Sequence, residues 1–193
     1  GNKGCILKGV CGKDFSTANL MDLLVFNLKG IAIIMTSMRR AGVKADYRKA
    51  DKAIMESLFA TITNANFDYS SIAKRVEKTF ALKAELYSLA FTQGIELPEN
   101  EAVTMQGKPE EYDRLALSVG ILRETDEDVR SLKELTIYGL KGLAAYAEHA
   151  DRLGYVDEEI NAFTERALHD VTMGLLSAEE LTALVLETGS FGV

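Results

Sequence analysis

The chain has few of the residues that usually build a metal site or a disulfide framework, and this scarcity limits its chemistry. Its 193 residues contain two cysteines, two histidines, two prolines and no tryptophan. Both cysteines, Cys5 and Cys11, fall in the first eleven residues, so they do not form the framework of a disulfide-rich secreted domain. No basic and apolar signal segment opens the sequence. These features predict a cytoplasmic protein.

Acidic residues outnumber basic ones, 29 to 22, and long uninterrupted apolar runs are scarce. A net charge of −7 argues against nucleic-acid binding, which needs a basic patch. The most apolar window, Leu20–Met38, approaches the roughly 20 residues of a bilayer span. However, Asp22, Asn27 and Lys29 interrupt it, and a charge at a membrane-helix centre costs about 2.5–3.5 kcal/mol. We therefore expect a buried helix and no membrane partner.

The two cysteines lie among glycines and lysines in GNKGCILKGVCGK, a setting that stabilises thiolates. They are candidate metal ligands or a redox pair. Two thiolates are an incomplete site, because iron–sulfur clusters and structural zinc usually take four ligands. His149 and His169 are distant in sequence, and each fits a polar helix face. Either a partner completes the site or the chain is a piece of a longer protein, as its lack of an initiator methionine suggests.

Apolar periodicity predicts an all-α fold. Residues 16–93 are expected to form a first three-helix bundle, with breaks at Gly42 and before Asp68, the expected N-cap of the third helix. The inward residues of the three helices are Leu20, Leu23, Leu24, Ile31, Ile34 and Met38, then Ala50, Ile54, Leu58 and Ile62, then Ile72, Val76, Phe80, Leu86 and Ala90.

A linker and a second bundle are expected to follow. Residues 94–124 hold both prolines and one possible short helix around Glu110–Leu117. Residues 125–193 are predicted to form the second three-helix bundle. Its helices have candidate caps at Thr125 with Asp128, at Asp157, and at Ser177 with Glu180.

The two predicted bundles resemble each other. LLVFNLKGIA at 23–32 aligns with LTIYGLKGLA at 135–144 at an offset of 112, which also carries Gly42 onto Gly154. We infer an internal duplication of a three-helix unit. The mid-helix glycines predict close helix crossings, since each costs about 1 kcal/mol relative to alanine. The matched lysines, Lys29 and Lys141, are either functional or solvated at the bundle edges.

Several blocks resemble the N-terminal helical domain of the hybrid cluster protein family, also called prismane proteins or hydroxylamine reductases and related to carbon monoxide dehydrogenases. The blocks are GNKGC…GVCGK, DLLVFNLKGIA, LFATITNANFD, DEDVRSLKELTIYGLKGLAAYAEHAD and LETGSFGV, and they occur in this order from one end of the chain to the other. The resemblance implies two three-helix bundles. It also implies a 4Fe–4S cluster held by C-x2-C and C-x5-C pairs.

Cys5 and Cys11 match the second of these pairs, and the first would precede Gly1. Residues 1–15 would thus be a truncated cluster-binding segment. Its glycines, including Gly12, would permit tight turns, and lysines such as Lys13 would offset the cluster's negative charge. A hybrid iron–sulfur–oxygen cluster would lie in later domains, so the segment alone is expected to be inactive and to hold half a site or no cofactor.

The function implied by the resemblance is reduction of hydroxylamine to ammonia, or of related nitrogen oxides such as nitric oxide. The implied partners are the remaining domains and an electron-donor protein. We also expect the isolated segment to form a homodimer. Two other hypotheses stay open. One is a stand-alone helical interaction module without catalysis. The other is a two-cysteine protein that forms a reversible Cys5–Cys11 disulfide or shares one zinc per dimer.

Overall fold

The computed structural model describes residues 12–62 and 65–192, and helices dominate this part of the chain. The predicted all-α class is confirmed. The α-helices are α1 (Phe15–Arg40), α2 (Arg48–Ala60), α3 (Tyr69–Thr92), α4 (Glu101–Thr104), α5 (Tyr112–Ser118), α6 (Glu127–Arg152), α7 (Glu158–Met173) and α8 (Ala178–Phe191), with 3-10 turns at Pro109–Glu111 and Ile121–Arg123.

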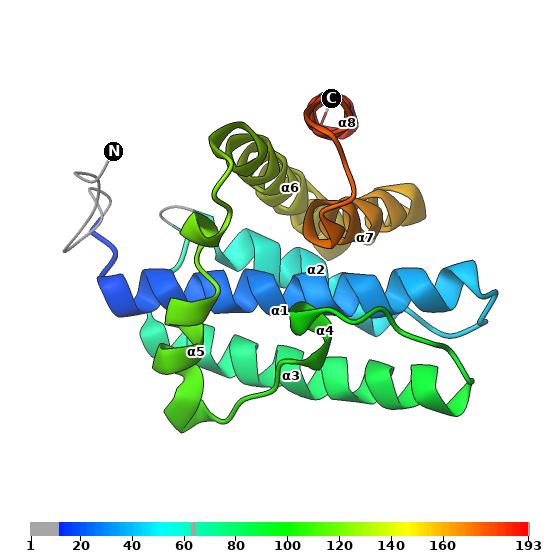
Figure 1. The fold of residues 1–193 in the computed structure, drawn as a ribbon, viewed down its shortest axis with the longest axis horizontal. Coiled ribbons are helices and arrows are strands. Elements are labelled where there is room, and N and C mark those ends of the chain that lie inside the picture. The colour runs from blue at the N-terminus through cyan, green and yellow to red at the C-terminus, as the bar shows by residue number, and fades with distance from the viewer. Residues whose placement is uncertain (1–11, 63–64, 193) are drawn as a thin grey trace.

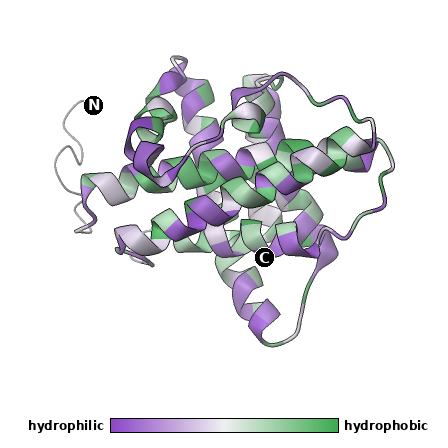
Figure 2. Ribbon diagram, turned by 90° about the horizontal axis from the view of Figure 1, so that it is seen from below, coloured by the Kyte–Doolittle hydropathy of each residue, from purple (hydrophilic) through white to green (hydrophobic). Residues whose placement is uncertain are grey.

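Helix α1 is the centre of the fold (Figure 1). In that view α3 lies below it, α4 and α5 in front, α6 and α7 above, and α8 outermost. Buried residues occur on all sides of α1, including the unbroken run Gly30–Thr36, and a helix of that kind is stable only when it is covered all round. The neighbouring helices supply that cover. Figure 2 colours the ribbon by residue hydropathy, seen from the side on which α3 lies.

Helix α1 is also the one described helix that is long and apolar enough to cross a membrane by length and composition. Its most apolar 18-residue window is 78% buried inside the protein. Burial of this kind is what a core helix requires, and it agrees with the interpretation of Leu20–Met38 as a buried helix.

One hydrophobic core joins the two halves of the chain. It combines Leu28 of α1 and Ile54 of α2 with Leu140, Leu168 and Leu184 of α6, α7 and α8, all of them buried. A smaller cluster packs α1 against α3 and α5. The two expected three-helix groups therefore share apolar packing, and the duplication itself stays a prediction.

The boundaries of α1 and α6 keep the offset seen in the sequence. Each helix has 26 residues, and both ends of α1 fall on the ends of α6 after a shift of 112. Gly42 and Gly154 follow them with φ angles of 76° and 85°. Glycine is favoured in that left-handed region because it has no Cβ to clash with the backbone.

Most predicted caps are confirmed. Asp68 and Asp157 accept hydrogen bonds from the first-turn amides of α3 and α7, and Ser177 forms a capping box with Glu180. The Thr125 cap is wrong by one residue, because Asp126 accepts from the amides of the second and third residues of α6. The short helix of the linker is confirmed as α5, whereas α4 was not predicted.

The two matched mid-helix glycines have different surroundings. A Cβ on Gly30 would overlap the carbonyl oxygen of Ala102 in α4 and lie 2.7 Å from its carbon, so the predicted close approach is confirmed there. Nothing lies within 4 Å of the corresponding position on Gly142, and the prediction is wrong for that residue within the described structure. Gly30 brings α4 against α1, whereas no described residue covers the equivalent position on α6.

A buried lysine secures α4 over Gly30. The ammonium of Lys83 donates to the Ala102 carbonyl at 2.8 Å and to the Asn27 side-chain oxygen at 3.0 Å. Its side chain is fully buried, and desolvation by that burial lowers its pKa to about 7. Both acceptors are uncharged, so the group has no carboxylate to restore its charged form.

Candidate functional site

The predicted ligands, Cys5 and Cys11, lie outside the described residues. The described chain begins at Gly12, whose φ of 94° fits the tight turn expected of that glycine. Lys13 follows it and is buried, with its ammonium 3.2 Å from the Met21 sulfur and 5.4 Å from the centre of the Phe67 ring. Asp14 then caps α1 by accepting from the amide of Thr17 at 2.7 Å.

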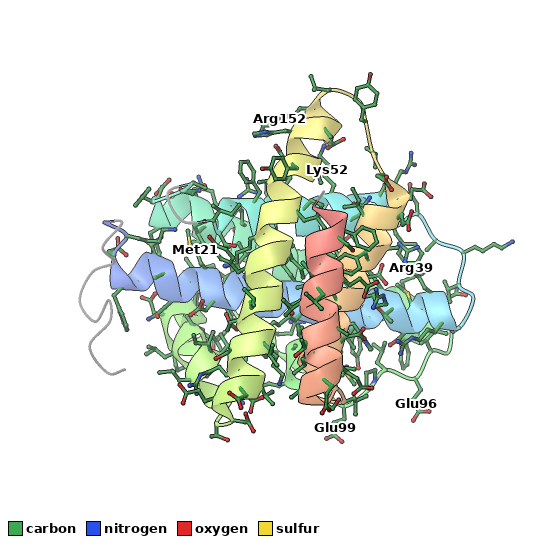
Figure 3. All side chains as sticks on the ribbon, turned by 90° about the horizontal axis from the view of Figure 1, so that it is seen from above. Met21, Arg39, Lys52, Glu96, Glu99 and Arg152 are labelled. Atoms are coloured by element: carbon green, nitrogen blue, oxygen red, sulfur yellow. The ribbon has the colours of Figure 1, made fainter. Side chains whose placement is uncertain are left out.

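The cysteine-bearing segment leads into a group of charges on α1 and α6, which we call the α1–α6 charge group. It consists of Asp22 and Lys29 from α1 and Glu134 and Lys141 from α6, all partly buried. Each helix supplies an acid and a lysine seven residues apart, at positions related by the offset of 112. Asp22 follows Met21, which Figure 3 labels, and Lys29 lies two turns further along α1.

Burial shifts the acid–base properties of this group. It raises the pKa of Asp22 to about 6 despite the attraction of Lys141 and Lys29, and Glu134 adds a smaller repulsion. It also lowers the pKa values of Lys29 and Lys141, against the attraction of the two carboxylates. Lys29 and Lys141 are both partly buried, so neither is fully solvated.

Lys13 lies close to the α1–α6 charge group, since its repulsion lowers the pKa of Lys141. The next residue, Asp14, caps α1 and adds a third carboxylate beside Lys13. Each desolvated ammonium of the group would gain from a nearby anionic group, because burial disfavours its charged form. Asp22 titrates near neutral pH and can hold or release a proton there. Sequence reasoning missed this group, although the offset that pairs the lysines also pairs Asp22 with Glu134.

Replacing Asp22 with asparagine should change how stability depends on pH. A folded-state pKa near 6, above the ordinary 3.8, means that the folded chain loses stability as pH rises between these values. The Asp22→Asn chain should lack this loss and be more stable at pH 7 by on the order of 1 kcal/mol. Urea unfolding at pH 4 and pH 7 measures both effects. A parallel pH dependence in the two chains would contradict the assigned pKa, and Glu85→Gln, at an exposed ion pair, is the control.

A second polar network lies near the other end of α1, where Figure 3 labels Arg39. The Arg39 guanidinium lies 2.8 Å from a Glu165 carboxylate oxygen in α7 and 3.7 Å from Asp51 in α2. Thr36 donates to the second Glu165 oxygen at 3.0 Å. Burial raises the pKa of Glu165 and brings that of Asp51 to about 6, with Arg39 opposing both shifts. This network ties three helices together.

A hollow of about 940 Å³ opens beside this network, between α2, the end of α6 and the start of α7. Its lining has seven carboxylates and three cations, so it favours a cation over an anion. One oxygen each of Asp51 and Glu148 is buried there without a hydrogen-bond partner. Lys52 at its edge pairs with Asp151 at 2.8 Å. Asp51 belongs to the Arg39 network, whereas Glu148 pairs with Arg152, 2.7 Å away.

The histidines do not converge on a site. His149 is exposed and meets Phe59 edge-on, with ring centres 5.6 Å apart. His169 is buried and its Nδ1 lies 2.7 Å from an Asp170 oxygen, so its expected place on a polar face is wrong. Across residues 12–62 and 65–192, no three His, Cys, Asp or Glu side chains gather closely enough to hold a metal ion.

Comparison with known proteins assigns the family. The family model described as Prismane/CO dehydrogenase family matches residues 1–193, and the chain belongs to this family. A hydroxylamine reductase of Porphyromonas gingivalis is 99% identical over all 193 residues, which cover 35% of its length. A hydroxylamine reductase of Desulfitobacterium hafniense is 49% identical, and one of Bacteroides thetaiotaomicron is 46% identical, each over 98% of this chain. The chain spans about a third of the length of these relatives.

Proposed function

We propose that the full-length protein reduces hydroxylamine to ammonia, with related nitrogen oxides such as nitric oxide as further substrates. In the hydroxylamine reaction two electrons and two protons cleave the N–O bond and release one ammonia and one water. The observation that carries this proposal is the 99% identity to a hydroxylamine reductase over every residue of the chain. The segment itself contributes electron transfer, and substrate reduction takes place at a hybrid cluster in the remaining domains.

We propose that Cys5 and Cys11 supply two of the four thiolates of a 4Fe–4S cluster. Such a cluster passes electrons one at a time when it is bound. The fit of the neighbouring residues supports this assignment. Gly12 has the positive φ expected of a tight turn, and the buried Lys13 lies where the cysteine segment joins α1, with the partly buried Lys141 near enough for Lys13 to lower its pKa. An anionic cluster would offset the desolvation of those lysines.

The chain's own residues then have distinct roles in this proposal. Lys13, two residues after Cys11 in the sequence, would supply positive charge that stabilises the ionised thiolates, and Lys141 would add to it. Asp22, with a pKa near 6, takes up or releases a proton at its carboxylate as the local charge changes. We place the protein in the cytoplasm, with an electron-donor protein as partner and no nucleic acid or membrane.

Ammonia formation by the full-length protein tests the proposed reaction. Anaerobically purified protein, supplied with a chemically reduced viologen and hydroxylamine, should form about one ammonia per hydroxylamine consumed. The isolated 193-residue chain is the control and should form none, because it lacks the remaining domains. Cluster-loaded full-length protein that consumes no hydroxylamine would contradict the proposal.

We also propose that the two halves of this chain arose from a duplicated three-helix unit. The equal lengths of α1 and α6, their shared offset and the paired glycines that end them support it. The paired acid and lysine of each helix in the α1–α6 charge group add a further match. The exposed apolar residues of the second half also lead us to propose that isolated segments associate with one another, which light scattering on dilution tests.

A further inference from the structure

The outer face of α6 has a row of apolar side chains that residues 12–62 and 65–192 leave exposed. Leu135, Tyr138 and Tyr146 are 51%, 73% and 73% exposed, and Gly142 lies between the two tyrosines. Their spacing of three, four and four residues places all four on one side of the helix. We call this row the α6 stripe. An isolated exposed tyrosine is ordinary on a protein surface, whereas an aligned apolar row indicates a contact.

The equivalent row on α1 is covered. A shift of 112 carries the α6 stripe onto Leu23, Phe26, Gly30 and Ile34. Leu23 and Ile34 are fully buried and Phe26 is partly buried. The two helices thus present similar side chains at similar positions, and they differ in what lies over them.

Residues 94–124, which follow the third helix of the first half, provide much of the cover on α1. Ala102 of α4 lies so close to Gly30 that no Cβ fits between them. Tyr112 and Leu115 of α5 share a hydrophobic cluster with Leu23. In the second half, the corresponding third helix is α8, and the chain that follows it is the counterpart of this linker.

The position of α8 allows the chain that follows it to lie over α6. A Cβ on Gly139 would lie 2.7 Å from the Thr188 methyl, so the last turns of α8 lie against the middle of α6. Gly139 precedes Gly142 by less than one turn of helix. The hydroxylamine reductase of Porphyromonas gingivalis, which this chain matches over 35% of its length, supplies ample further chain.

We propose that the α6 stripe is the docking surface for the polypeptide that follows Val193 in the full-length protein. That polypeptide lies over α6 as residues 94–124 lie over α1, with its backbone approaching Gly142 as Ala102 approaches Gly30. Because the α6 stripe is apolar and has a glycine at its centre, the segment that binds it should be apolar and should bring its backbone close to Gly142. This inference concerns assembly and does not depend on the redox reaction.

Hydroxyl-radical footprinting of the full-length wild-type protein, read by mass spectrometry, tests the proposal. Tyr155 is the internal control, since it is 74% exposed but lies after α6 and outside the stripe. We expect Tyr138 and Tyr146 to be oxidised at least fivefold more slowly than Tyr155, with all three equal in denatured protein. Equal native rates would overturn the proposal. Protection that disappears on dilution to monomers would also overturn it, by assigning the surface to a second copy.

A substitution tests the role of the glycine. Gly142→Leu in the full-length protein should raise the oxidation rates of Tyr138 and Tyr146 severalfold and leave that of Tyr155 unchanged. The variant is expected to fold, because the described residues leave open space there and leucine has the higher helix propensity. Undiminished protection in the variant would overturn the assignment of Gly142 as the contact point.

Discussion

Replacing Gly30 with alanine is expected to destabilise the chain by about 3 kcal/mol. The added methyl would overlap the Ala102 carbonyl and lie 3.0 Å from the Lys83 side chain. Helix α4 must then move away, and the buried Lys83 ammonium loses one of its two oxygen acceptors. This cost exceeds the roughly 1 kcal/mol that alanine gains over glycine inside a helix.

Gly142→Ala is the matched control for this prediction. Its position is equivalent by the offset of 112, yet no atom of the described residues lies within 4 Å of the new methyl. This variant of the 193-residue chain should be more stable by up to about 1 kcal/mol. In urea unfolding, the change in the free energy of unfolding should therefore have opposite signs in Gly30→Ala and Gly142→Ala. A shift of the same sign in both would contradict the packing of α4 against α1.

Replacing Arg39 with methionine should cost about 3 kcal/mol at pH 7. The substitution keeps much of the side-chain volume but leaves Glu165, 3% exposed, and Asp51, 12% exposed, without their shared cation. An unpaired buried carboxylate is costly because the protein interior solvates charge poorly. The partial exposure of Arg39 keeps the expected loss at the lower end of the range for buried pairs.

The stability lost in the Arg39→Met variant should be larger at neutral pH than at acidic pH. Burial already raises the pKa values of Glu165 and Asp51, and removing Arg39 raises them further. A carboxyl with a raised folded-state pKa destabilises the fold as pH rises through that pKa. The free energy of unfolding of Arg39→Met, measured with urea, should therefore fall below that of the wild-type chain by more at pH 7 than at pH 4. Arg48→Met, which removes an exposed pair with Asp46, is the control and should change little at either pH.

Local signals in the sequence were sufficient to predict most helices. Asp157 and the Ser177–Glu180 box begin helices through hydrogen bonds that span only two or three residues, so the sequence shows them directly. Helix α4 was missed for the opposite reason. Its four residues carry little periodicity, and its place depends on Lys83 and Gly30, which are distant in the chain. Long-range contacts decided its position.

The polar sites were harder to predict than the helices. Arg39 and Glu165 are separated by 126 residues, and no pattern in either helix indicates that they meet. The α1–α6 charge group had a visible signal, since the same offset relates Lys29 to Lys141 and Asp22 to Glu134. The sequence alone did not show that these four side chains are partly buried in the fold. The cysteines were found from their clustering, and their role rests on family resemblance.

Iron content of the full-length protein tests most directly whether Cys5 and Cys11 hold a cluster. Anaerobically purified wild-type protein should be compared with the Cys5→Ser/Cys11→Ser variant, with Lys8→Gln as a control that leaves both thiolates in place. The account predicts that the double variant loses about four irons and four sulfides per chain and retains the iron of the remaining domains, while the control loses none. Equal iron and sulfide in all three proteins would contradict the assignment of these cysteines as cluster ligands.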